Sequence, residues 1–198
     1  MTRPSRDAGA LASSVKYSLL LICLGALCAA TASAQAIQSV YTDSRGKQCR
    51  TLERDDDAAG YLLQQCPGVA GYKVQVMSGD DRQNIIVVKP DGSKHELNFG
   101  QIGGGGFSDV GAKVEWRVAR QRGRLVPIAL IVRFNISEDS SNPQKITSYL
   151  TVTKITPRKI CLIDTVHPGP NANEEARRLA DGSASKPCFE VLPPPDTQ

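Results

Sequence analysis

Short β-branched runs separated by turn residues dominate the chain from Tyr72 onward, and this alternation constrains the fold more than any other feature. Ile85 to Val88 is one such run, and Pro90-Asp91-Gly92 follows it with residue types that tight hairpin turns prefer. Runs of this kind, bounded by turn signals, are typical of antiparallel strands. The pattern therefore predicts a mainly β fold, a single antiparallel meander that forms either a small barrel or a sandwich.

A second hairpin is predicted from residues 113–119, a turn at 121–123 and a returning strand at 125–136. Alternation on its first strand places side chains inward at Val114, Trp116 and Val118 and outward at Lys113, Glu115 and Arg117. Pro127 has no N–H to donate to a neighbouring strand, so it indicates an edge or a bulge. Further strands are predicted at residues 36–41, 61–65, 146–155 and 160–166.

One short helix is predicted near the C-terminus, at residues 173–180. Asn173 is a suitable N-cap, two glutamates occupy the first turn, and Gly182 can end the helix. A helix of this length is not stable alone in water, so it needs a surface to pack against. The proline-rich residues 193–198 are predicted to form a disordered tail.

The first 34 residues have the pattern of a cleavable secretory signal. Three basic residues precede the charge-free apolar run 17–30, and Ala32-Ser33-Ala34 then supplies small side chains, which predicts cleavage after Ala34. The 14 residues of the run span only about 21 Å as a helix. That length is short of a hydrocarbon core of about 30 Å, so an uncleaved anchor is the less favoured alternative and no stable membrane span is expected after cleavage.

The expected mature chain has 164 residues and is interpreted as one β-rich domain, 35–192, followed by the tail. Its four cysteines are an even number in an exported chain, which indicates disulfides. The pairing between sequence neighbours, Cys49 with Cys66 and Cys161 with Cys188, is favoured over the other two pairings. A zinc site is the weaker alternative, because the chain lacks a Cys-x-x-Cys motif and its two histidines, His95 and His167, are distant in sequence from the cysteines.

The charge of the expected mature chain is nearly balanced. Removing residues 1–34, which hold three basic and one acidic residue, lowers the formal net charge from +4 to +2. This balance does not favour a nucleic-acid partner. No cofactor and no metal ion are predicted, since the acidic residues 53–57 lack the ligand spacing and central glycine of a calcium-binding EF-hand loop.

The candidate binding residues are the four arginines around the second hairpin, Arg117, Arg120, Arg122 and Arg124. Guanidinium groups suit carboxylates and phosphates, so this cluster predicts contact with an anionic envelope component or a protein partner. The alternative is a solvated hairpin whose charges protect a sheet edge from aggregation.

The glycine-rich segment from Gly100 to Gly111 is predicted to connect two hairpins flexibly, with a mobile lid as the alternative. It lacks the Gly-Lys-Ser/Thr ending of a phosphate-binding loop. Ser108 and Asp109 lie within it and, together with His95 or His167, suggest a hydrolytic triad as a weak alternative. No Gly-x-Ser-x-Gly motif supports this assignment.

These observations predict an exported cell-envelope protein, periplasmic or secreted, that acts as a non-enzymatic binding or interaction module. Two alternatives remain from the sequence. One is an envelope hydrolase that uses the Gly100–Gly111 loop, and the other is a purely structural envelope protein.

Overall fold

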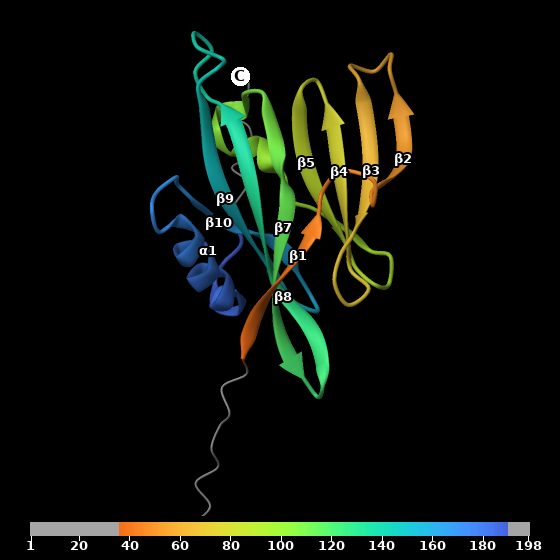
Figure 1. The fold of residues 1–198 in the computed structure, drawn as a ribbon, viewed down its shortest axis with the longest axis vertical. Coiled ribbons are helices and arrows are strands. Elements are labelled where there is room, and N and C mark those ends of the chain that lie inside the picture. Colours follow the sequence, from red (N-terminus) through yellow and green to blue (C-terminus); the bar gives the residue numbers. More distant parts are fainter. Residues whose placement is uncertain (1–35, 190–198) are drawn as a thin grey trace, which may run out of the picture. The chain divides into compact units, whose positions relative to one another are not determined.

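The computed structural model describes residues 36–189, in which two antiparallel sheets pack face to face and a helix covers the outer face of one sheet (Figure 1). In spatial order, the first sheet contains β1 (Ile37–Asp43), β7 (Ser108–Gln121), β8 (Arg124–Ser137), β9 (Ile146–Ile155) and β10 (Ile160–Val166). The second contains β2 (Arg50–Asp55), β3 (Tyr61–Pro67), β4 (Lys73–Gly79), β5 (Arg82–Val88) and β6 (Lys94–Glu96). The predicted signal segment and the predicted tail lie outside the described residues.

The mainly β, antiparallel fold is confirmed, and of the two predicted forms the structure has the sandwich-like one. The meander is divided between the sheets: β2 to β6 form one, and β7 to β10 form most of the other. β1 joins the sheet of β7, with Ile37 opposite Ala119. Along the described chain, the first strand therefore belongs to the first sheet, the next five strands form the second sheet, and the last four strands belong to the first sheet again.

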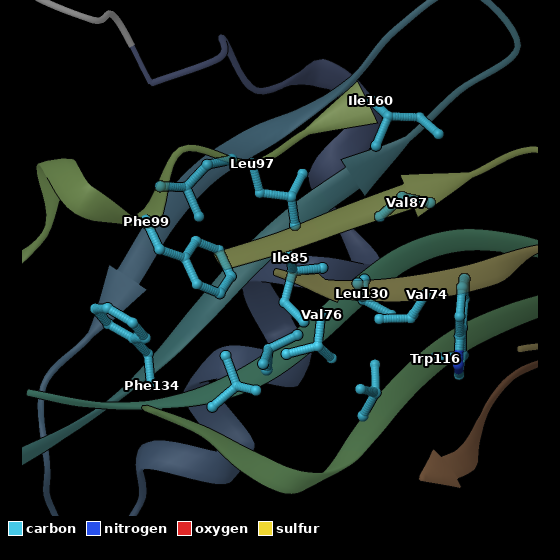
Figure 2. Close-up of a cluster of buried hydrophobic side chains, with 14 of the residues drawn as sticks. Val74, Val76, Ile85, Val87, Leu97, Phe99, Trp116, Leu130, Phe134 and Ile160 are labelled. Atoms are coloured by element: carbon cyan, nitrogen blue, oxygen red, sulfur yellow. The ribbon is translucent and has the colours of Figure 1, made fainter. Parts of the chain in front are cut away.

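The hydrophobic core lies between the two sheets. Val114, Trp116 and Val118 are 0% exposed on the inner face of β7, as the alternation predicts. Figure 2 shows side chains of the second sheet and of the first converging on this layer. The labelled members are Val74, Val76, Ile85, Val87, Leu97, Phe99, Trp116, Leu130, Phe134 and Ile160. Because dense apolar burial provides most of the stabilisation of such a domain, this layer holds the sheets together.

Both predicted hairpins are present. The turn between β5 and β6 has Gly92 at φ 86°, and the turn between β7 and β8 has Arg122 at 50° and Gly123 at 78°. Two consecutive positive φ values are the geometry of a type I′ turn, whose twist matches that of the strands it joins. Pro127 lies opposite Val118 at a shift in the β7–β8 register, which confirms the predicted bulge.

β2 is the strand that the sequence pattern does not reveal. Every residue of β2 is exposed, so its side chains show no alternation between apolar and polar types. The solvated turn predicted after it is confirmed, because the Asp55 carboxylate accepts hydrogen bonds from the amides of Asp57 at 3.0 Å and Ala58 at 3.1 Å.

Helix α1 (Ala172–Asp181) corresponds to the predicted helix and extends it slightly at both ends. The prediction of Asn173 as N-cap is wrong: Asn171 occupies that position, without a side-chain capping bond, and Gly182 ends the helix as predicted. The buried side chains of α1 pack against the outer face of the first sheet in a second apolar cluster. Its members are Ala129, Ile131, Leu150, Val152, Ile163, Val166, Ala176, Leu179 and Ala180.

The two disulfides join Cys49 to Cys66 and Cys161 to Cys188, the pairing favoured from the sequence. They span 17 and 27 residues, and in the chain-entropy model each such link stabilises a domain by about 3 kcal/mol. The bond from Cys188 to Cys161 ties the segment that follows α1 to β10. The Phe189 amide also donates a hydrogen bond to the carbonyl of Leu162 in β10 at 2.7 Å.

The glycine-rich connection between β6 and β7 packs into the sandwich at several points. It contains two short 3-10 helices, Phe99–Gln101 and Gly103–Gly105, and Phe99 is fully buried in the core. A Cβ atom at Gly106 would lie 1.8 Å from the carbonyl oxygen of Ser137. Glycine is therefore required there so that the connection can lie against the end of β8.

This close approach predicts the effect of adding one methyl group. Gly106→Ala must displace the end of β8 or the connection, and we expect it to lower the free energy of unfolding by about 2 kcal/mol or more. Gly100→Ala is the matched control, since its Cβ would meet nothing within 4 Å. Urea unfolding measures both variants, and equal midpoints would contradict the packing described here.

Candidate functional site

Arg120, Arg122 and Arg124 surround the turn between β7 and β8, and we refer to them as the arginine tip. All three are exposed. The pairing of β1 with β7 stops at Ala119 and that of β9 with β8 stops at Ala129, so the hairpin projects beyond the rest of its sheet (Figure 1). Within residues 36–189, none of the three arginines forms an ion pair.

Arg117 does not belong to the arginine tip. The sequence groups it with the other three and places it outward, but in the structure it is 8% exposed beneath α1. Its guanidinium binds the Asp181 carboxylate through Nε at 2.7 Å and Nη2 at 2.8 Å. Arg117 does lie on the outer face of β7, but it is not exposed, because a helix whose position the local pattern does not show covers that face.

A buried polar network surrounds Arg117 and joins α1 to the sheet. Glu115, which is also 8% exposed, accepts hydrogen bonds from Arg177 Nε at 2.7 Å and from Ser39 Oγ at 2.5 Å. Arg117 also donates to Ser39 Oγ, and Arg177 donates to the Tyr41 hydroxyl at 2.9 Å. We call these contacts the helix clamp, because they connect α1 to both β1 and β7.

The helix clamp shifts the pKa values of Glu115 and Arg177. Burial raises the pKa of Glu115, but hydrogen bonds from Arg177 and Ser39 outweigh this and hold that pKa below the ordinary value. The hydrogen bond to Glu115 raises the pKa of Arg177 further above neutrality. Both shifts favour the charged forms of Glu115 and Arg177 at neutral pH.

The opposite end of the β7–β8 hairpin contains a cleft that the sequence does not predict. The Ser108 amide donates to the carbonyl of Asp81 at 2.9 Å, and the Asp80 amide donates to that of Ala59 at 3.0 Å. These bonds bring the β2–β3 and β4–β5 turns against the start of β7. Three adjoining hollows of 420, 350 and 480 Å³ open there, all lined in part by Arg82, and together they form the loop-end cleft.

Two exposed apolar side chains flank the loop-end cleft. Phe107 is 52% exposed and Ile146 is 55% exposed, and both line its 420 Å³ hollow. The Arg82 guanidinium lies 5.5 Å from the centre of the Phe107 ring and also binds Asp80. Aromatic rings and arginines of this kind are enriched at protein interfaces, so the cleft is suited to receive part of another molecule.

The same cleft carries carboxylates at its mouth. Asp81 and Asp109 line the 420 Å³ hollow, and Asp109 accepts a hydrogen bond from the Asn135 amide group at 3.1 Å. Apolar residues of the sandwich, Phe134 and Ile136, line the 350 Å³ hollow beneath. The arrangement combines an apolar floor with an acidic mouth, and it favours a ligand that is apolar and cationic.

The structure does not assemble the triad considered from the sequence. Ser108 lies at the cleft, but its hydroxyl forms no hydrogen bond with His95 or His167. His95 is on β6, and the ring of His167 contacts Tyr149 edge-on with centroids 5.0 Å apart. Among residues 36–189, no group of three or more histidine, cysteine or acidic side chains is arranged to hold a metal ion.

Comparison with protein-family models, curated proteins and solved structures yields no match for this chain. In the described part of the chain, no helix is long and apolar enough to cross a membrane.

The different environments of the arginines predict different effects of their removal. Arg117→Ala leaves Glu115 and Asp181 without a buried cation, and we expect the free energy of unfolding to fall by about 3 kcal/mol. Arg120→Ala is the control, for which a change within about 0.5 kcal/mol is expected because the side chain is exposed. Thermal and urea unfolding distinguish the two, and equal losses would refute the helix clamp.

The lowered pKa of Glu115 predicts a dependence of stability on pH. A carboxyl group whose pKa is lower in the folded state stabilises the fold above its unfolded pKa, near the ordinary value of 4.5, and this contribution is lost as pH falls through the folded pKa. Glu115→Gln should therefore destabilise the protein most at neutral pH. The difference in unfolding free energy between wild type and variant should shrink as the pH falls below 4.5, and a constant difference would contradict this role.

Proposed function

We propose that this protein is an exported, non-enzymatic binding module of the cell envelope whose arginine tip contacts an anionic component. The observation that carries the proposal is the set of three exposed arginines, without ion pairs in the described chain, on a hairpin that projects from its sheet. Because these arginines form no ion pair within the described chain, their charge is available to bind a partner.

The chemistry of the arginine tip favours phosphate or carboxylate groups. Each guanidinium can donate two parallel hydrogen bonds to such a group, which lysine cannot do. The type I′ turn holds the strands in register, so the arginines are presented by ordered backbone. Ordered presentation reduces the entropy lost on binding.

Neighbouring turns add to the positive charge at this end. The β9–β10 turn, which contains Arg158 and Lys159, lines a shared hollow with Gln121 and Val126 of the hairpin. Lys89 of the β5–β6 turn reaches the same region and donates to the carbonyl of Pro157 at 2.8 Å. A local positive field of this kind accelerates encounter with an anionic surface, in a way that salt weakens.

Export is part of the proposal and is supported by two features. The N-terminal segment has the pattern of a secretory signal, and the described domain contains two disulfides, which form in oxidising compartments. A periplasmic or extracellular location agrees with both. A hydrolase is not proposed, because no observed contact activates Ser108.

The proposal is tested by removing the charge of the arginine tip. We expect the protein to cosediment with phosphatidylglycerol vesicles at low salt and not with phosphatidylcholine vesicles, and Arg120→Ala, Arg122→Ala and Arg124→Ala together should weaken this binding at least about tenfold. Arg45→Ala, Lys47→Ala and Arg50→Ala together are the matched control, since these exposed residues carry the same charge elsewhere.

Cross-linking in intact cells extends this test to a protein or polymer partner. The wild-type protein should be captured with an anionic component, and the variant without the arginine tip should not, while thermal stability is unchanged. Equal capture and equal vesicle binding by the two proteins would refute the proposed role of the tip.

A further inference from the structure

The loop-end cleft is an exposed apolar surface whose surroundings indicate what covers it. Phe107 and Ile146, both more than half exposed, lie beside its hollows. Six carboxylates lie at this end of the sandwich, on the β2–β3 turn, the β4–β5 turn and the start of β7. They are Asp55, Asp56, Asp57, Asp80, Asp81 and Asp109, and we call them the acidic rim.

The acidic rim is only partly neutralised by its neighbours. Arg82 forms an ion pair with the Asp80 carboxylate, and Arg54 lies 3.9 Å from the Asp56 carboxylate in a solvent-exposed pair. The turns that carry the rim are held together by the bond from the Asp80 amide to the Ala59 carbonyl. An apolar cleft with a negative mouth is complementary to an apolar segment that carries positive charge.

The arginine tip has that composition. It presents three arginines, and the half-buried side chains of Leu125 and Val126 follow directly on β8. The acidic rim and the arginine tip thus lie near opposite ends of the β7–β8 hairpin. β7 has 14 residues, which at about 3.3 Å per residue places its ends roughly 45 Å apart, so the tip cannot reach the cleft of its own molecule.

We propose that the loop-end cleft receives the arginine tip of a second copy of this chain. Arginines of the tip lie against the Phe107 ring and the carboxylates of the acidic rim, and the apolar side chains behind them contact Ile146. Arginine and aromatic residues supply much of the binding energy of known interfaces, particularly where charge and ring are packed together.

The contact is heterologous, because a different surface of each copy takes part. A bound pair still presents one free tip at one end and one free cleft at the other, so assembly continues into a chain or closes into a ring. This inference uses the arginine tip of the proposed function, and it is tested on purified protein in the absence of any envelope component.

The first measurement is sedimentation velocity of the processed protein purified from the exporting cells. At about 20 mM salt we expect the average mass to rise with protein concentration, and at about 500 mM salt we expect monomer, because screening weakens contacts between exposed charges. Phe107→Ala should weaken association about tenfold at low salt, since it removes the aromatic contact and leaves the charges in place.

Charge reversal provides the decisive test. A tip-reversed variant carries Arg120→Glu, Arg122→Glu and Arg124→Glu, and a rim-reversed variant carries Asp56→Lys, Asp57→Lys, Asp109→Lys and Asp81→Asn, which changes the charge of the six rim positions from −6 to +1. Asn is chosen because Asp81 has φ 51°, a conformation that asparagine tolerates. Each variant alone should be monomeric, whereas an equal mixture should associate again, since each tip now meets a cleft of opposite charge.

A matched control separates the effect of the total charge from the effect of where the charge lies. Arg45→Glu, Lys47→Glu and Arg50→Glu produce the same change in net charge as the tip-reversed variant but place it between β1 and β2, and this variant should associate like the wild type. A wild-type protein that stays monomeric at low salt, a mixture that stays monomeric, or a control that dissociates equally would each overturn the inference. Binding of the monomer to anionic vesicles would still support the proposed function, so the two proposals fail separately.

Discussion

The pairing of β7 with β8 is the contact on which the rest of the structure depends. Both strands have 14 residues, and their inner faces contribute Trp116 and Leu130 to the core between the sheets. Their outer faces carry Ile131 and the buried charges under α1. Because this one hairpin also reaches both ends of the sandwich, it sets the separation between the arginine tip and the loop-end cleft.

Burial of the charged side chains of Glu115 and Arg117 under a short helix needs a physical explanation. A buried ion pair loses hydration that its mutual attraction only partly replaces, so the helix clamp is not a strong source of stability by itself. Its specific geometry matters more, since Glu115 and Arg117 can be satisfied only when α1 presents Arg177 and Asp181 to them. Burial of the apolar cluster around Leu179 stabilises the packing of α1 on the sheet, and the helix clamp selects one position for the helix.

Local chemistry in the sequence predicts much of this fold but little of its surface. Gly92, Gly123 and Pro127 determine turns and a bulge through backbone geometry, so these features can be derived from a few adjacent residues. The pairing of β1 with β7 and the burial of Arg117 depend on segments far apart in the chain, which no local pattern contains. The same limit applies to Phe107, because the sequence does not show that its ring stays exposed.

The two proposals concern the same arginines, and this sharing has a thermodynamic consequence. An arginine tip held in the cleft of another copy cannot contact an anionic surface at the same time. Self-association therefore lowers the concentration of free tips, and an anionic component in excess draws molecules out of the assembly by mass action. Only the terminal molecule of an open chain retains a free tip, whereas a closed ring retains none. Reversible, salt-sensitive contacts are suited to such an exchange because no covalent or large apolar interface has to be broken first.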